Sequence, residues 1–179
     1  VIKAIILVGA LAASYSATAE TVTTSNESGC DTSVLKKISS SVHPKQKVYQ
    51  DFSSCKKMPN NPELTIIAEL LERSDDPNTF DLSVVVTKSD SGEVIGKYFE
   101  KEHHFAGAGS DIFDTLKVDT ANYRLNTDTR AFGVMSGHGR FCCRDTFRED
   151  NITLFTMKDS EIKPIMGEIN LHGRYDIPN

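Results

Sequence analysis

The sequence predicts a mainly β protein: an antiparallel β-sandwich or barrel-like single domain with a short N-terminal helix. Three observations indicate this class. Short segments of alternating apolar and polar residues recur from residue 63 onward, turn-forming residues separate them, and one segment near residue 35 has helical periodicity. With 179 residues, of which 39% are hydrophobic and 25% charged, the chain is long enough for one domain with its own core.

The first residues have the composition of a secretory signal peptide. Lys3 precedes an apolar run over residues 4–13, and Ala17-Thr18-Ala19 is a small-x-small cleavage site. The apolar run is too short to span a bilayer as a helix. We therefore expect a signal peptide over residues 1–19, no membrane span after its cleavage, and a periplasmic or secreted protein.

A polar segment and then a helix follow the predicted cleavage site. Residues 20–30 are rich in Thr and Ser without periodicity, which indicates a flexible leader before a single β-rich domain over residues 31–179. In DTSVLKKISSSV, one of the first three residues can serve as the N-cap. His43-Pro44 ends the predicted helix, because the residue before a proline avoids the helical conformation. The apolar face of this helix consists of Val34, Leu35, Ile38 and Val42.

The clearest strand pattern lies between residues 63 and 99. In ELTIIAELLE and in TFDLSVVVTK, apolar residues alternate with polar ones, so one face of each strand is apolar. The turn SDSG predicts a hairpin with VIGKYF, because Asp90 can bond its own backbone and Gly92 tolerates a positive φ angle. Further short strands are expected over residues 112–118, 123–125, 131–135, 152–157, 162–166 and 169–172.

The charge of the chain excludes some classes of partner. Its formal net charge is −5, which gives no electrostatic reason to bind nucleic acid or an anionic membrane surface. Residues 36–57 are locally basic, with six lysines and one acidic residue. We interpret them as a solvated face, with a binding patch as the alternative. The expected partner is a protein or another envelope component.

Four cysteines are candidates for disulfide bonds, which form in exported proteins: Cys30, Cys55, Cys142 and Cys143. If FCCRDTF is extended, the two adjacent cysteines point to opposite faces of the strand. A bond between them needs a distorted peptide unit, because their Cα atoms are about 3.8 Å apart and most disulfides need ~4.4–6.8 Å. The geometry therefore favours two long-range bonds, in which Cys30 and Cys55 each bond one of the two adjacent cysteines. Cys30–Cys55 together with a vicinal bond is the main alternative, and other pairings stay open.

Three histidines are the candidates for catalysis or metal binding. Glu102, His103 and His104 resemble part of a metal cluster but complete no known motif, and adjacent histidines on a strand diverge. His138 lies near the two adjacent cysteines, but H-x3-C-C is not a zinc-binding spacing, and an oxidising compartment disfavours thiolate ligands. We therefore name no catalytic residue, metal or cofactor. An envelope hydrolase or a metal-binding protein that uses these histidines is the alternative.

Several stretches resemble a family of conserved hypothetical secreted or periplasmic proteins of Gram-negative bacteria, notably pseudomonads and their relatives. The stretches are CKKMPNNPELTIIAE, FDLSVVVTKSDSGEVIG, VDTANYRL, TRAFGVMSGHGR and ITLFTMKDSEIKPIMGEI, and together they cover most of residues 55–169. The resemblance implies an exported β-rich domain without an established activity, so it supplies no catalytic residues. The chain departs from the family's pattern at Met58, where an aromatic residue is usual, and in lacking a cysteine near its end, GRYDIPN.

The sequence predicts an exported, non-catalytic binding or interaction module of the cell envelope. Loops on a rigid sheet usually carry such contacts. SGHGRFCCR combines flexible glycine with positive charge, so His138, Arg140 and Arg144 are the candidate binding-loop residues. Besides the enzyme, the remaining alternative is an inhibitor or immunity protein, with which small size, export and disulfides are compatible.

Overall fold

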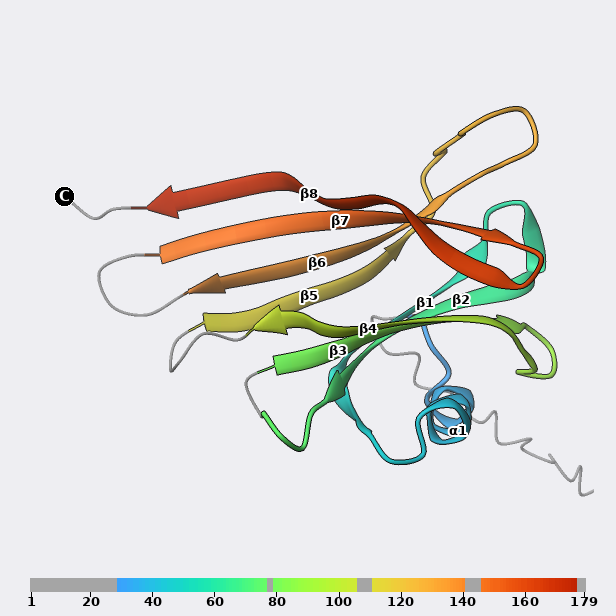
Figure 1. The fold of residues 1–179 in the computed structure, drawn as a ribbon, viewed down its shortest axis with the longest axis horizontal. Helices are drawn as coiled ribbons and strands as arrows, with labels where there is room; N and C mark the ends of the chain where they lie inside the picture. The colour runs from blue at the N-terminus through green and yellow to red at the C-terminus, as the bar shows by residue number, and fades with distance from the viewer. Residues whose placement is uncertain (1–28, 77–78, 106–110, 141–145, 177–179) are drawn as a thin grey trace, which may run out of the picture.

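The computed structural model describes residues 29–76, 79–105, 111–140 and 146–176, which form one helix and eight strands (Figure 1). The elements are α1 (Thr32–Val42), β1 (Lys47–Met58), β2 (Asn61–Glu72), β3 (Thr79–Lys88), β4 (Val94–Phe105), β5 (Asp111–Asp119), β6 (Phe132–Arg140), β7 (Thr146–Lys158) and β8 (Glu161–Asp176). The predicted mainly β class is confirmed, and the strands belong to a single sheet that curls into a half-barrel. The described residues contain no apolar helix of membrane-spanning length.

The sheet consists of two four-stranded antiparallel halves. Its strand order is β1-β2-β3-β4-β8-β7-β6-β5, and β4 joins β8 in parallel through one bridge, between Lys97 and Glu161. The edge strands β1 and β5 also come into contact. There the backbone N–H of Val118 donates a hydrogen bond to the Oγ of Ser54 at 3.0 Å. The sheet therefore curls until its two edges meet.

The inner face of the curled sheet holds the main core. The alternation predicted for the second and third strands is confirmed, since every second side chain there points inward: Ile66, Ala68, Leu70, Phe80, Leu82, Val84 and Val86. The other half contributes Leu116, Val118, Phe132, Val134, Phe155 and Ile162. The ring of Phe155 stacks on Phe132 at 5.8 Å and meets Tyr98 edge-on at 5.1 Å. This shared core holds the two halves together more extensively than their single bridge does.

Helix α1 packs on the outer face of β2 and β3 (Figure 1). Leu35 and Ile38 of the helix form a second apolar cluster with Ile67 and Val85 of the sheet. Because the inner core covers the opposite face, β3 is buried on both sides, and each residue from 79 to 87 is buried.

The boundaries of α1 agree with the prediction. Asp31 is the N-cap, and its Oδ1 accepts hydrogen bonds from the backbone N–H groups of Ser33 at 2.8 Å and Val34 at 3.3 Å. The helix ends before His43, as expected from the proline that follows. The predicted hairpin between β3 and β4 is also present, and Gly92 has a φ angle of +71°.

Among the described residues, a disulfide bond joins Cys30 to Cys55. The favoured prediction, two long-range bonds from this pair to Cys142 and Cys143, is therefore wrong. Packing of α1 on the outer face of the sheet places the start of the helix beside β1, so the two early cysteines meet. Cys30, at the end of the predicted leader, is itself buried. Cys142 and Cys143 lie outside the described residues.

Two further differences concern segments with weak patterns. No strand was predicted over residues 47–58, where β1 lies, because an irregularity between Val48 and Ser53 interrupts the alternation. Residues 123–125, predicted as a strand, form only an isolated bridge between Arg124 and Arg130.

Candidate functional site

The segment predicted as a binding loop is largely a strand. His138 and Arg140 belong to β6, which pairs with β7 along this stretch, whereas Arg144 lies outside the described residues. The loop assignment is therefore wrong for His138 and Arg140, because the β6–β7 ladder extends further than the glycines suggested. His138 lies opposite Glu149, and its Nε2 is 3.6 Å from the Oε2 of that carboxylate.

The acidic and histidine residues near the end of β4 do not converge on one point. The Oε1 of Glu102 is 3.1 Å from a guanidinium nitrogen of Arg73, whereas the Nδ1 of His103 is 3.4 Å from the Oε2 of Glu100. The His104 side chain lies outside the described part of the structure. Among the residues that are described, no group of three or more His, Cys, Asp or Glu side chains is arranged to hold a metal ion.

Glu100 also accepts a hydrogen bond from the hydroxyl of Tyr98 at 3.1 Å. The hydrogen bond with His103 lowers the pKa of Glu100, although burial opposes this effect. Burial and the nearby Glu100 carboxylate raise the pKa of Tyr98 to about 12. At neutral pH the carboxylate is therefore ionised and the phenol protonated. Neither pKa therefore lies near neutral pH.

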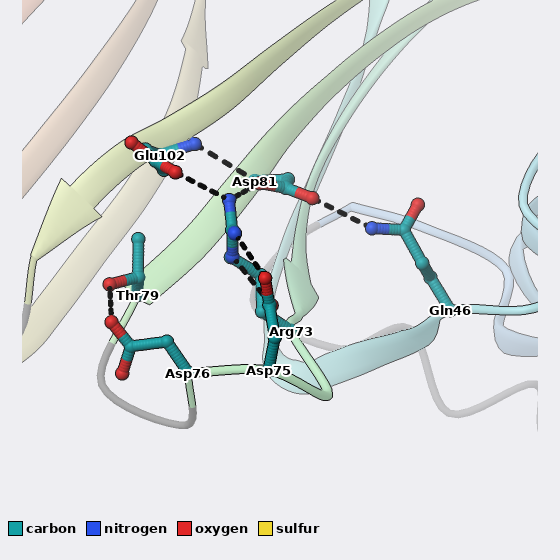
Figure 2. Close-up of polar contacts among 7 residues, drawn as sticks. All are labelled: Gln46, Arg73, Asp75, Asp76, Thr79, Asp81 and Glu102. Atoms are coloured by element: carbon teal, nitrogen blue, oxygen red, sulfur yellow. Dashed lines mark hydrogen bonds and ion pairs between the residues drawn. The ribbon is translucent and has the colours of Figure 1, made fainter.

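A polar cluster around Asp81 fixes the chain before β1 and the chain after β2 to the sheet (Figure 2). Asp81 is 3% exposed, and it accepts hydrogen bonds from Gln46 at 2.7 Å and from the backbone N–H of Glu102 at 3.0 Å. Arg73 lies 3.4 Å from the same carboxylate and forms two shorter bonds, of 3.0 and 2.6 Å, with Asp75. Because both Asp81 oxygens are occupied by neighbouring groups, we assign this cluster a structural role.

A buried carboxyl group lies beneath α1. Glu69 of β2 has no exposed surface; its Oε1 contacts the Ser39 hydroxyl, and its Oε2 has no hydrogen-bond partner among the described residues. Burial raises the pKa of Glu69 to about 6, although the Ser39 hydrogen bond lowers it in part. The hydroxyl oxygen of Ser39 also lies 2.7 Å from the carbonyl oxygen of Leu35, and its single proton can be donated to only one of these two acceptors. A protonated Glu69 can donate to Ser39 while Ser39 donates to Leu35, so the geometry accommodates the neutral acid.

A groove of about 540 Å³ runs between α1 and the chain that leads into β1. This volume lies within the range of small-molecule pockets, roughly 300–1,000 Å³. Ser39 lies in its wall and connects the groove to the buried Glu69. One face of α1 and the segment after it supply the lining: Thr32, Leu35, Lys36, Ser39, Ser40, His43, Pro44, Gln46, Lys47 and Val48.

Strand β8 carries several exposed apolar side chains along one stretch. Figure 1 shows it along the upper margin of the sheet, with its later part away from β4. It pairs with β7 over its length but meets β4 only at Glu161, and each residue from 163 to 171 is exposed. The apolar side chains of this stretch, exposed by between 38% and 51%, are Ile165, Met166, Ile169 and Leu171. We call these four residues the β8 patch.

The backbone of β8 is irregular next to this patch. The β7–β8 ladder has three register irregularities, and Pro164 lacks a backbone N–H. Bulges and prolines at a sheet edge disfavour the addition of another strand. The β8 patch is therefore better suited to side-chain contacts than to pairing along a flat edge.

These features define a class: a mainly β half-barrel with a disulfide-linked helix on its outer face and an apolar patch on one strand. Comparison with protein-family models, curated proteins and solved structures finds no match for the chain. The resemblance to secreted proteins of Gram-negative bacteria therefore stays a prediction.

Proposed function

We propose that the protein is an exported, non-catalytic binding module of the cell envelope and that the β8 patch contacts its partner. The observation that carries this proposal is the exposure of four large apolar side chains on one strand, half of the eight such side chains exposed in the described structure. Scattered apolar residues are ordinary on protein surfaces, whereas a group of them marks an interaction site.

The charges near the patch favour an apolar, neutral or basic segment of another protein as the partner. Glu161 is paired with Lys163 at 2.8 Å, which leaves Glu168 as the remaining acidic group of the exposed stretch. A second copy of this chain would bring another formal charge of −5. Because like charges repel, self-association is less favourable than binding to a partner of opposite or no charge.

Two observations support export. The Cys30–Cys55 bond is of a kind that persists in oxidising compartments such as the periplasm. The composition of residues 1–19 is that of a signal peptide. Glu102 contacts Arg73 and His103 contacts Glu100, and this separation supports a binding role over a hydrolase that uses Glu102 and His103 together.

Site-specific photo-cross-linking in cells tests the proposal. A photoreactive residue at Leu171 should form a discrete protein adduct, whereas the same residue at Lys88, an exposed position at the end of β3, should not. Adding Met166→Lys and Ile169→Lys should reduce the Leu171 adduct about tenfold, because both changes place charge in an apolar contact. Thermal unfolding should change little, since exposed side chains contribute only about 0.5 kcal/mol to stability.

Three results would contradict the proposal. They are the absence of an adduct at Leu171, an identical adduct at Lys88, and an adduct that survives the two lysine substitutions.

A further inference from the structure

We propose that the groove between α1 and the start of β1 binds a small anionic amphiphile, a molecule with an apolar body and one carboxylate or phosphate group. This site is separate from the β8 patch, and its occupant belongs to a different chemical class. The inference rests on the lining of the groove, on its charge, and on the way its walls are held.

The lining combines three apolar side chains with seven polar or charged ones. Leu35 and Val48 provide apolar surface from opposite walls, and Pro44 adds to it. Lys36 provides an ammonium donor from the exposed side of α1, whereas the hydroxyl of Ser40, one helical turn further on, donates to the carbonyl oxygen of Lys36 at 2.8 Å. A concave site that combines apolar surface with a few charged or hydroxyl groups is typical of small-molecule binding.

The charge of this region favours an anion. Two of the six lysines in residues 36–57, Lys36 and Lys47, line the groove, and none of its lining residues is acidic. Lys36 is exposed and forms no ion pair with any described residue. Lys47 is paired through contacts of 2.8 and 2.9 Å with Glu72, and this pairing neutralises the Glu72 carboxylate. Lys36 is therefore the cation that a bound anion would meet.

The walls of the groove are fixed at both ends. The Cys30–Cys55 bond holds the start of α1 against β1. Beyond the end of α1, the Nε2 of His43 lies 2.8 Å from the Oγ of Ser83, and Gln46 binds Asp81. A site whose walls are held before binding loses less conformational entropy when it takes up a ligand.

The size of the groove sets the occupant's class. About 540 Å³ accommodates a molecule with an apolar portion of roughly ten carbons, which is much smaller than a folded partner. A free amphiphile and the headgroup region of an anionic lipid present the same chemistry. The experiment therefore contains separate arms for decanoate, decyl phosphate and phosphatidylglycerol vesicles.

Calorimetric titration of the full chain with decanoate and with decyl phosphate, both as monomers, tests the site. We expect saturable one-to-one binding of both anions and at least tenfold weaker binding of uncharged decanol. Lys36→Glu should weaken anion binding about tenfold or more, because it replaces an attraction by a repulsion. The matched control is Lys37→Glu, which makes the same charge change on the neighbouring residue, outside the groove lining.

A second variant separates shape from charge. Ser40→Phe fills the groove without changing its charge and should abolish binding of both anions, while circular dichroism and the melting temperature confirm that the variant is folded. Equal losses in Lys36→Glu and Lys37→Glu would overturn the proposal, because they would indicate diffuse attraction. Tight binding of decanol, binding to the vesicles alone, or undiminished binding by the Ser40→Phe variant would also overturn it.

Discussion

Glu69 shows how a single residue makes the stability of the molecule depend on pH. Its carboxyl group is enclosed between β2 and α1, and burial raises its pKa from the ordinary value of 4.5 to about 6. Between these two values the folded chain binds more protons than the unfolded chain. Stability therefore falls as the pH rises from 4.5 to about 6, and the full penalty applies at higher pH.

We predict that Glu69→Gln is more stable than the unmodified protein at pH 7.5, by roughly 2 kcal/mol, and about equal to it at pH 4.5. Glutamine retains an oxygen next to Ser39 but carries no charge. Urea unfolding at the two pH values measures the difference. Glu72→Gln, a change at a partly exposed position of the same strand, serves as the control and should show no comparable gain. A Glu69→Gln variant with the same pH dependence as the unmodified protein would exclude this explanation.

At the scale of the element, α1 depends on its disulfide and on the sheet beneath it. The helix has 11 residues, which is short for a helix that is stable alone in water. Its buried side, centred on Leu35 and Ile38, and the Cys30–Cys55 bond supply the tertiary support. The sequence predicts the ends of this helix well, because an Asp N-cap and a His-Pro terminator act over a few residues. It does not reveal which surface the helix covers.

The double variant Cys30→Ser, Cys55→Ser should lose about 3 kcal/mol of unfolding free energy, since the bond closes a loop with a sequence separation of 25 residues. Amide hydrogen exchange should also become faster at Ile67 and Val85, beneath the helix. The comparison is made in a background with Cys142→Ser and Cys143→Ser, so that no other thiol takes part. An unchanged denaturation midpoint would show that packing alone holds α1.

At the scale of the whole molecule, the closure of the half-barrel depends on few backbone contacts. The halves share one bridge between β4 and β8, and the hydrogen bond from Val118 to Ser54 connects the two edge strands. Val118 is fully buried and Ser54 is 5% exposed, so water has little access to this bond. Removing its acceptor leaves a buried N–H group without a partner.

Ser54→Ala should therefore destabilise the protein by about 1–3 kcal/mol and accelerate hydrogen exchange at the Val118 amide. Ser41→Ala, a change of the same size on the exposed side of α1, should alter stability by less than about 0.5 kcal/mol. Chemical denaturation of both variants gives the comparison. Equal stabilities of the two variants would mean that this bond does not contribute to closure.

The exposed β8 patch illustrates a limit of sequence patterns at this scale. The two strands predicted over residues 162–166 and 169–172 are one strand, because bulges in its pairing with β7 break the alternation. Pro164 is tolerated because β8 pairs with β4 only at Glu161, so the stretch that follows has no described strand on that side. No local pattern in the sequence indicates that β8 meets β4 at a single residue. Because β4 does not continue alongside β8, the apolar side chains of β8 stay exposed.

By itself, the sequence determined the mainly β class, the capped helix, the β3–β4 hairpin and the apolar inner faces of β2 and β3. Each of these depends on residues within a few positions of one another. Only the tertiary structure decided that Cys30 bonds Cys55, that α1 covers Glu69 and borders a groove, and that His138 lies within a strand. These outcomes depend on which surfaces pack together, and a pattern along the chain marks a face as apolar or polar without naming its neighbour.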